Sequence, residues 1–237
     1  NPGDDSKLAD SFSKSGKIFL ESILDSTSSG ESIDAEMFSR QQILFVQDGQ
    51  ITKVGQGWKE IRSYYGIQTN LPVFNSTIKG YGSANVVPDS SDDIVRRQPL
   101  VLKYSSLEGE MPFEALEPGM AVDEAAFQRL SWLDRKGQEH QIALPLTQKS
   151  LEKLRKEIYR SAPPMTYDKD GDGNPESETR AIELYRDCFM PSITLRLALN
   201  YWNASLSDCE VIPGKFISVH RPGKDPVIIP IDEQCSM

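Results

Sequence analysis

The stretch WLDRKGQEHQIALPLTQKSLEKLRKEIYRS, residues 132–161, joins a predicted β-hairpin directly to a predicted helix. Lys136-Gly137 lies between two alternating segments, and a glycine supplies the backbone freedom that a tight turn requires. Thr147 is a good N-cap for the helix that follows. Three apolar residues then share one helical face: Leu151, Leu154 and Ile158. A hairpin that leads into a helix without a parallel crossover favours an α+β fold.

Outward from this stretch, helical and hairpin patterns follow one another without regular strand–helix alternation. Hairpins are expected at 42–55 and 215–231, and helices at 6–25, 58–66, 122–132, 175–189 and 192–204. The prediction is therefore α+β, with antiparallel hairpins packed against several helices. Within it, a helical segment at 147–206 is interrupted by an acidic loop. Residues 1–237 are expected to form one domain, with a subdivision into 1–106 and 107–237 as the alternative.

Charge and hydropathy exclude two classes of partner. The chain has 35 acidic and 26 basic residues and a net charge of −9. Binding to nucleic acid or to an anionic lipid surface needs a positive field, so neither is predicted. No apolar run approaches the roughly 20 residues that cross a bilayer, so no membrane span is expected. The predicted partner is another protein.

The cysteines and the start of the chain bear on the compartment. The chain begins NPGDDSK without methionine, so we expect that an upstream segment was removed by a signal peptidase or in preparing the protein. We expect Cys188 and Cys209 to form a disulfide and Cys235 to stay free, which suits an extracytoplasmic (periplasmic or secreted) protein. The alternative is three free thiols in a cytoplasmic protein.

Catalytic motifs are sparse. The two histidines, His140 and His220, are each predicted within a strand, and no spacing places a nucleophile or metal ligand beside either. There is no phosphate-binding G-x-x-x-x-G-K loop, no G-x-G-x-x-G fingerprint and no G-x-S-x-G elbow. The pattern favours a protein that is not an enzyme without deciding the question.

The acidic stretch YDKDGDGNPESE, residues 167–178, is typical of a metal-binding loop. Calcium takes six to eight oxygen ligands, and carboxylates on alternate residues of a tight loop can converge on one ion. DKDGDG, residues 168–173, resembles the opening of a calmodulin-type EF-hand loop. The resemblance implies a calcium site, with its ligands at Asp168, Asp170, Asp172, Asn174 and Glu176.

Departures from the EF-hand pattern indicate a lone, structural site. The twelfth position, normally a bidentate glutamate, is Thr179, and Pro175 stands where paired loops normally join. Glu178, or Glu183 further along, is expected to replace the missing ligand. Because regulatory EF-hands work in pairs, we expect this calcium to stabilise the fold and not to act as a sensor.

Together these observations predict a soluble extracytoplasmic binding or interaction protein with one structural calcium ion. The alternative is an exported hydrolase whose active site is assembled from residues distant in sequence. A histidine beside a carboxylate or cysteine in a pocket would favour the hydrolase, whereas an apolar surface without such a pocket would favour binding.

Overall fold

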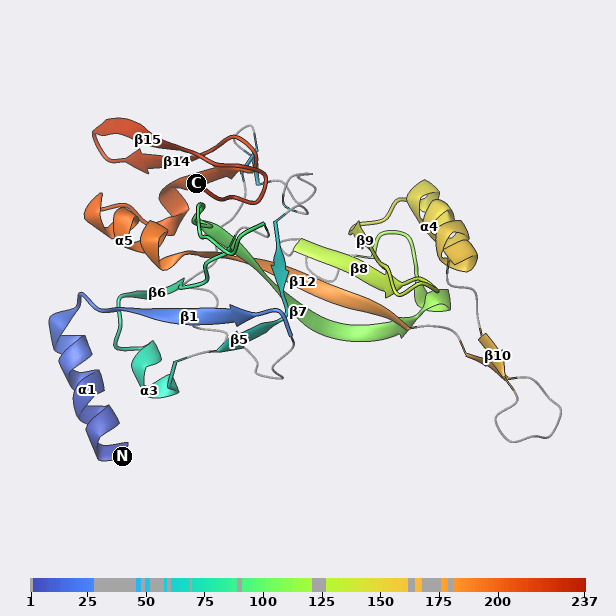
Figure 1. Ribbon diagram of the computed structural model, residues 1–237, viewed down its shortest axis with the longest axis horizontal. Coiled ribbons are helices and arrows are strands. Elements are labelled where there is room, and N and C mark those ends of the chain that lie inside the picture. The colour runs from blue at the N-terminus through green and yellow to red at the C-terminus, as the bar shows by residue number, and fades with distance from the viewer. Residues whose placement is uncertain are drawn as a thin grey trace. The chain divides into compact units, whose positions relative to one another are not determined.

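The computed structural model describes residues 2–27, 46–47, 50–51, 58, 61–68, 70–88, 91–120, 127–161, 165–167, 176–178 and 181–237 (Figure 1). The chain packs into two compact units. Unit 1 comprises Asn1–Ser105 and Cys188–Met237, and unit 2 comprises Ser106–Asp187. This division describes packing, and the expectation of one domain stays a prediction.

Unit 1 begins with a helix and a small mixed sheet. Its elements are α1 (Pro2–Ser15), β1 (Phe19–Asp25), β2 (Val46–Gln47), β3 (Gln50–Ile51), β4 (Ser63–Tyr64), β5 (Gly66–Gln68), α3 (Pro72–Asn75) and β6 (Gly80–Ser83). Strand β1 is central, antiparallel to β5 and parallel to β6. Aromatic and aliphatic side chains from these elements form one core, in which the rings of Phe12 and Phe74 lie 5.3 Å apart.

The C-terminal part of unit 1 adds a helix and a three-stranded sheet. Its elements are α5 (Ile193–Tyr201), the 3-10 helix η3 (Leu206–Asp208), β13 (Cys209–Ile212), β14 (Phe216–Arg221) and β15 (Lys224–Pro230). The Ser192 hydroxyl caps α5 by accepting from the Leu195 N–H at 3.1 Å. A Cβ atom at position 82 would lie 2.5 Å from Ile193 Cα, so Gly82 lets α5 approach β6 closely.

Unit 2 is built mainly from strands with one long helix. Its elements include η2 (Phe113–Ala115), β8 (Phe127–Leu133), β9 (Glu139–Ala143), α4 (Gln148–Ser161), β10 (Met165–Tyr167) and β11 (Glu176–Glu178). Two long strands, β7 (Val101–Pro112) and β12 (Ala181–Pro191), run from one unit into the other. The strand order of their sheet is β4-β7-β12-β8-β9. In unit 2, Leu151, Leu154 and Ile158 of α4 share a core with Leu130 and Trp132 of β8.

The predicted α+β class is wrong, because the described part of the chain is mostly β-sheet and has few helices. The helical segment expected at 147–206 is also wrong. Only α4 and α5 are helical there, and they belong to different units. Strand β12 stands where a helix was expected at 175–189, and it lies within the five-stranded sheet, with β7 and β8 as its neighbours in the strand order. Pairing in a sheet has overridden local helix propensity.

Of the other local predictions, two helices are wrong in part and one hairpin is confirmed. The expected helix at 6–25 ends at Ser15, because Gly16 adopts a φ of +58°, and a strand follows. Residues 127–132, expected in a helix, lie in β8. The hairpin about Gly137 is confirmed. Its two strands pair so that Arg129 is opposite Ala143 at one end and Leu133 is opposite Glu139 at the other.

All three cysteines lie among the described residues; they are buried and form no disulfide, so the expected Cys188–Cys209 disulfide is absent from the structure. Burial raises the pKa of Cys209 and of Cys235 to about 12, so both thiols stay protonated at neutral pH. Over the described ranges, no helix has the length and apolar character to cross a bilayer.

Candidate ligand-binding pocket

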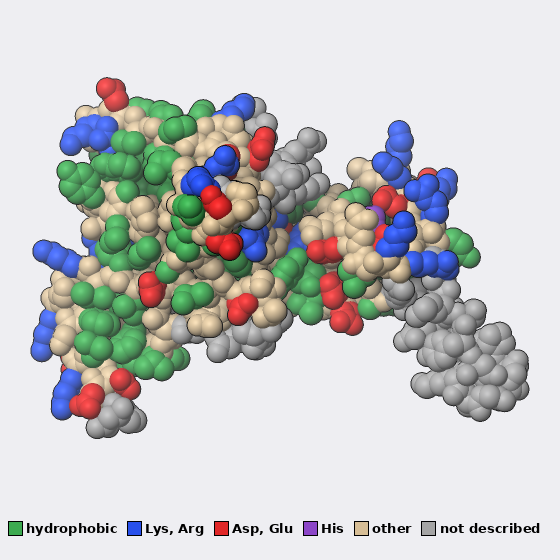
Figure 2. All heavy atoms as spheres, viewed as in Figure 1, with side chains coloured by type: hydrophobic (Ala, Val, Ile, Leu, Met, Phe, Trp, Pro, Cys, Tyr) green, Lys and Arg blue, Asp and Glu red, His purple; other side chains and the backbone are tan. Residues whose placement is uncertain are grey.

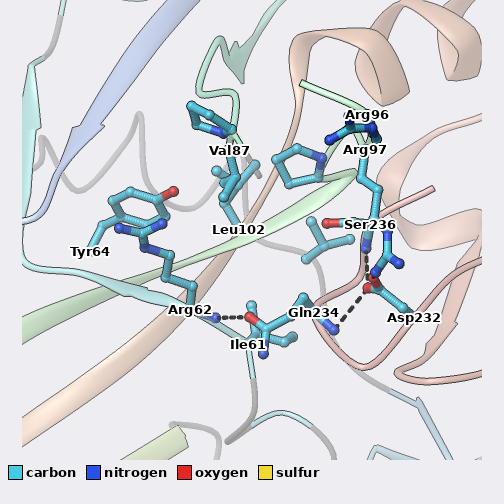
Figure 3. A pocket seen from close by; sticks show the side chains of 13 residues that line it. Ile61, Arg62, Tyr64, Val87, Arg96, Arg97, Leu102, Asp232, Gln234 and Ser236 are labelled. Atoms are coloured by element: carbon cyan, nitrogen blue, oxygen red, sulfur yellow. Dashed lines mark hydrogen bonds and ion pairs between the residues drawn. The ribbon is translucent and has the colours of Figure 1, made fainter. Parts of the chain in front are cut away.

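A cavity of about 240 Å³ opens in unit 1 between segments far apart in the sequence (Figure 3). It is lined by residues near β4, by the segment before β7, by the start of β7 itself and by the C-terminal segment after β15. The lining residues are Ile61, Arg62, Tyr64, Val87, Pro88, Arg96, Arg97, Pro99, Val101, Leu102, Asp232, Gln234 and Ser236.

The inner part of the cavity is apolar and belongs to the folded core. Ile61, Val101 and Leu102 are buried, and Leu102 also packs in the core of unit 1. Strand β4 pairs in parallel with β7, with Tyr64 opposite Tyr104, so the strand that carries Leu102 also holds Tyr64. An apolar lining held by a paired strand does not need a ligand to form it.

The C-terminal segment forms one wall and is held by backbone hydrogen bonds. The Leu100 N–H donates to the Cys235 carbonyl at 2.9 Å, and Gln98 and Met237 exchange bonds at 3.0 and 3.1 Å. One oxygen of Asp232 accepts from the N–H groups of Gln234 and Ser236, at 3.0 and 2.8 Å. Asp232 therefore shapes the wall from within, before any ligand is considered.

Arg62 supplies a cation that no described carboxylate neutralises. Its guanidinium lies 5.7 Å from the centre of the Tyr64 ring, and its backbone N–H donates to Gln234 Oε1 at 3.0 Å. Within the parts of the chain that the structure describes, it forms no ion pair. Burial raises the pKa of Tyr64, and the nearby Arg62 charge opposes the rise only in part. The Tyr64 phenol is thus a hydrogen-bond donor at neutral pH.

The other two arginines have carboxylate partners. Arg96 forms a two-pronged pair with Asp92, at 2.7 and 2.5 Å, and its hydrogen bond is the main reason that the pKa of Asp92 is lowered. Arg97 pairs with Asp232 at 2.9 Å. These pairs leave Arg62 as the cation best able to meet an incoming anion.

Figure 3 shows the two groups of charges on opposite sides of the cavity. Arg62 and Tyr64 lie on one side, and Arg97 with Asp232 lies on the other. The side chains of Val87 and Leu102 stand between them. A bound molecule would therefore meet the guanidinium groups of Arg62 and Arg97 at its two ends and the apolar side chains of Val87 and Leu102 between them.

The residues predicted to bind calcium are not brought into this pocket. Asp168, Asp170, Asp172 and Asn174 lie outside the described residues. Glu176 and Glu178 lie on β11, which pairs with β10 so that Glu176 is opposite Tyr167 and Glu178 is opposite Met165. The helix expected after the loop is therefore wrong, and a two-stranded ribbon brackets the loop instead. Among the described residues, no group of at least three His, Cys, Asp or Glu side chains could hold a metal ion.

Both histidines lie beside carboxylates, but neither lines the cavity. His140 stacks on Trp132 at 5.5 Å, and its Nε2 lies 3.3 Å from Asp134. The pKa of Asp134 is lowered, mainly by the N–H of Gln138 and also by His140. His220 is exposed and lies 3.8 Å from Glu210. Neither contact has the form of a nucleophile beside a base.

Basic side chains gather over α4 in unit 2 (Figures 1 and 2). Lys149, Lys153, Lys156 and Arg160 recur along the face opposite the buried residues of the helix. Such a stripe is typical of the solvated side of an amphipathic helix. It remains less specific than the cavity, which combines charge with a defined apolar lining.

The sequence did not predict the cavity, because its residues come from segments as distant as Ile61 and Ser236. The one local signal is the adjacent pair Arg96-Arg97 in an otherwise polar loop of an acidic chain. Comparison with family models, with curated proteins and with solved structures finds no match to this chain. The function must therefore be inferred from the geometry of the pocket.

Proposed function

We propose that this chain is a binding protein whose pocket in unit 1 takes an acidic group of a protein partner. The observation that carries the proposal is Arg62, a guanidinium with no ion pair among the described residues, at the edge of an apolar cavity. Guanidinium groups bind carboxylates through charge-assisted and often two-pronged hydrogen bonds. The protonated Tyr64 phenol beside Arg62 adds a second donor.

The size of the cavity supports a segment of a protein as the ligand. Its volume of about 240 Å³ is below the roughly 300 to 1,000 Å³ of typical small-molecule and cofactor sites. One acidic side chain or chain terminus with an apolar neighbour fits such a space. The acidic group would face Arg62, and the apolar neighbour would cover Val101 and Leu102.

Two further parts of the proposal rest on the sequence. One calcium ion bound at Asp168, Asp170, Asp172, Asn174, Glu176 and Glu178 would stabilise the loop that β10 and β11 bracket. An extracytoplasmic location suits a calcium site of low affinity, because extracellular modules work at roughly 10⁻⁴ to 10⁻³ M. An exported hydrolase is the second candidate from the sequence. The histidine contacts outside the pocket favour binding over that alternative.

Selection of peptides from a random displayed library on the immobilised full chain tests the proposal without a known partner. Enriched peptides are expected to share an aspartate, glutamate or free C-terminus next to apolar residues. In anisotropy titrations, the amide form of an enriched peptide is expected to bind at least roughly tenfold more weakly. Affinity for the acidic form should also fall as salt is raised.

Two variants locate the binding. Arg62→Gln should weaken the acidic peptide by roughly tenfold or more, since it removes a charged donor. Arg135→Gln is the matched control, because Arg135 is an exposed arginine in the turn between β8 and β9, outside the cavity. Enriched peptides without an acidic group, or equal binding to Arg62→Gln and to the wild type, would overturn the proposal. So would a selection that enriches nothing.

A further inference from the structure

A second cleft in unit 1 carries both signs of charge. It has a volume of about 320 Å³ and lies where β1, the turn before β6 and the end of α5 meet. Its lining residues are Phe19, Lys79, Arg196, Leu199, Asn200, Asn203, Ala204, Ser205 and Asp208. None of them lines the first cavity.

Two cations of the cleft come from different elements. Lys79 Nζ lies 5.9 Å from the centre of the Phe19 ring, and the Arg196 guanidinium carbon lies 6.0 Å from it. Lys79 Nζ also donates a hydrogen bond to Asn200 Oδ1. Lys79 forms no ion pair with a described carboxylate. The aromatic ring and the amide therefore position its charge without cancelling it.

The backbone of β6 makes room for Arg196. A Cβ atom at position 80 would lie 2.6 Å from Arg196 Nη2, closer than atoms that are not bonded can approach. Gly80 therefore lets the guanidinium lie against the strand. A larger residue at position 80 would displace Arg196 while leaving its charge unchanged.

The negative charge of the cleft belongs to Asp208, whose position is fixed by hydrogen bonds. Asp208 Oδ2 accepts from the Ser205 N–H and from the Ser205 hydroxyl, each at 2.7 Å. These bonds are the main reason that the pKa of Asp208 is lowered, so its carboxylate is ionised at neutral pH. Both bonds use the same oxygen, and Oδ1 accepts no hydrogen bond from a described residue.

We propose that this cleft binds a small zwitterion, of the class of free amino acids with an apolar side chain. The ligand carboxylate would meet Lys79 and Arg196, and its ammonium would meet Asp208. A simple anion would be repelled by Asp208 and a simple amine by the two cations. The apolar lining from Phe19, Leu199 and Ala204 would contact the side chain.

Calorimetric titration of the full chain with leucine and its two analogues tests the charge requirement. 3-Methylbutylamine lacks the carboxylate, and 4-methylpentanoate lacks the ammonium. Leucine is expected to bind saturably, and each analogue at least roughly tenfold more weakly, because the amine offers no group to Lys79 and the acid offers no group to Asp208. Phenylalanine with its corresponding amine and acid repeats the comparison with a larger side chain.

Variants then place the binding in the cleft. Lys79→Gln and Gly80→Ala should each weaken leucine by roughly tenfold, the first by removing a charge and the second by displacing Arg196. Gly109→Ala is the matched control for the second, since its Cβ atom would meet nothing within 4 Å. Lys14→Gln, an exposed lysine of α1, is the control for the first.

Three outcomes would overturn the proposal. The first is that neither leucine nor phenylalanine binds saturably up to about 10 mM, which is a weak limit for a specific site. The second is that the analogues bind as well as the amino acid, and the third is that leucine affinity is unchanged in both Lys79→Gln and Gly80→Ala. The proposal does not depend on the peptide pocket, because the two sites share no residue.

Discussion

Two arginine–aspartate pairs, one in each unit, have nearly the same length and different surroundings. In unit 2, Arg129 Nε lies 3.0 Å from Asp187, and the two side chains are 1% and 0% exposed. In unit 1, Arg97 Nη1 lies 2.9 Å from Asp232, and the side chains are 70% and 30% exposed. Distance alone would make them equivalent. Exposure decides what each pair contributes, because water and salt screen the second and not the first.

The buried pair lies between two strands of a sheet, whereas the exposed pair lies at the edge of a cavity. Arg129 lies on β8 and Asp187 on β12, and these two strands are adjacent in the sheet. The Arg129 guanidinium also lies 4.5 Å from the centre of the Tyr185 ring. Glu139 lies 3.5 Å from Arg129 and adds a second, half-exposed acid. Asp232, in contrast, organises the C-terminal wall of the ligand pocket. The pair in unit 2 is thus shielded inside a sheet, whereas the pair in unit 1 lines a pocket in which Arg62 is the cation proposed to meet the ligand.

The largest expected effect is that of Asp187→Asn. This change keeps the shape of the side chain and leaves Arg129 buried without its main partner, which should cost about 3 to 5 kcal/mol of unfolding free energy. Arg97→Gln, which breaks the exposed pair, should cost less than about 1 kcal/mol. Urea unfolding followed by circular dichroism measures both. Equal costs would show that exposure does not separate the two pairs.

A core substitution gives the corresponding test in unit 1. Leu199 of α5 is buried, so Leu199→Ala should cost about 2 to 5 kcal/mol through lost contacts and the cavity left behind. Leu197, on the same helix, is 48% exposed, and Leu197→Ala should stay within about 0.5 kcal/mol. The same urea titrations apply. A small effect at Leu199 would mean that α5 is not packed as the structure has it.

Helix α4 could be predicted from the sequence, whereas strand β12 could not. The face formed by Leu151, Leu154 and Ile158 identified α4, because a local apolar stripe and a good N-cap suffice for a helix on a core. The segment at 181–191 was wrongly predicted to be helical, because its Glu, Leu and Arg residues favour a helix in isolation. Its pairing with β8, including the Asp187 contact with Arg129, lies outside any local pattern.

The candidate pocket was beyond sequence reasoning for the same physical reason. Arg62 is about 170 positions from Gln234 in the sequence, and the Gln234 side chain accepts a hydrogen bond from the backbone N–H of Arg62. Only folding of the C-terminal segment onto Gln98 and Leu100 brings them together. The acidic stretch at 168–173, in contrast, could be interpreted locally, because its proposed ligands are sequence neighbours.

Alkaline pH should weaken the fold through two thiols of unit 1. Burial raises the pKa of Cys209 and Cys235 from 9.0 to about 12, so the folded state keeps two protons that the unfolded state releases above pH 9. Stability from these groups is complete below pH 9 and falls as pH rises toward 12, by about 1.4 kcal/mol per pH unit for each thiol. Unfolding free energies measured at pH 9 and 10 should therefore differ by about 1 to 2 kcal/mol more in the wild type than in a Cys209→Ala/Cys235→Ala variant.

Thiol counting provides the control for that experiment. In denaturant without reductant, three thiols are expected to react, as the structure has them. Two missing thiols would instead support the Cys188–Cys209 disulfide. Identical pH slopes in the wild type and the variant would contradict the assigned burial of Cys209 and Cys235.

The smallest expected effect is that of calcium on unit 2. With the affinity of an extracellular module, about 1 mM calcium should stabilise the protein by roughly 0.4 to 1.4 kcal/mol, because the ion binds only the folded form. Asp170→Ala should abolish the rise in melting temperature, since it removes one of the alternating carboxylates. Asp225→Ala is the matched control, an exposed aspartate in the hairpin of β14 and β15. If unit 1 holds the ligand site, calcium should leave peptide affinity at the Arg62 pocket unchanged. An unmoved melting curve would remove the calcium proposal, and a calcium-dependent peptide affinity would contradict the separation of roles between the two units.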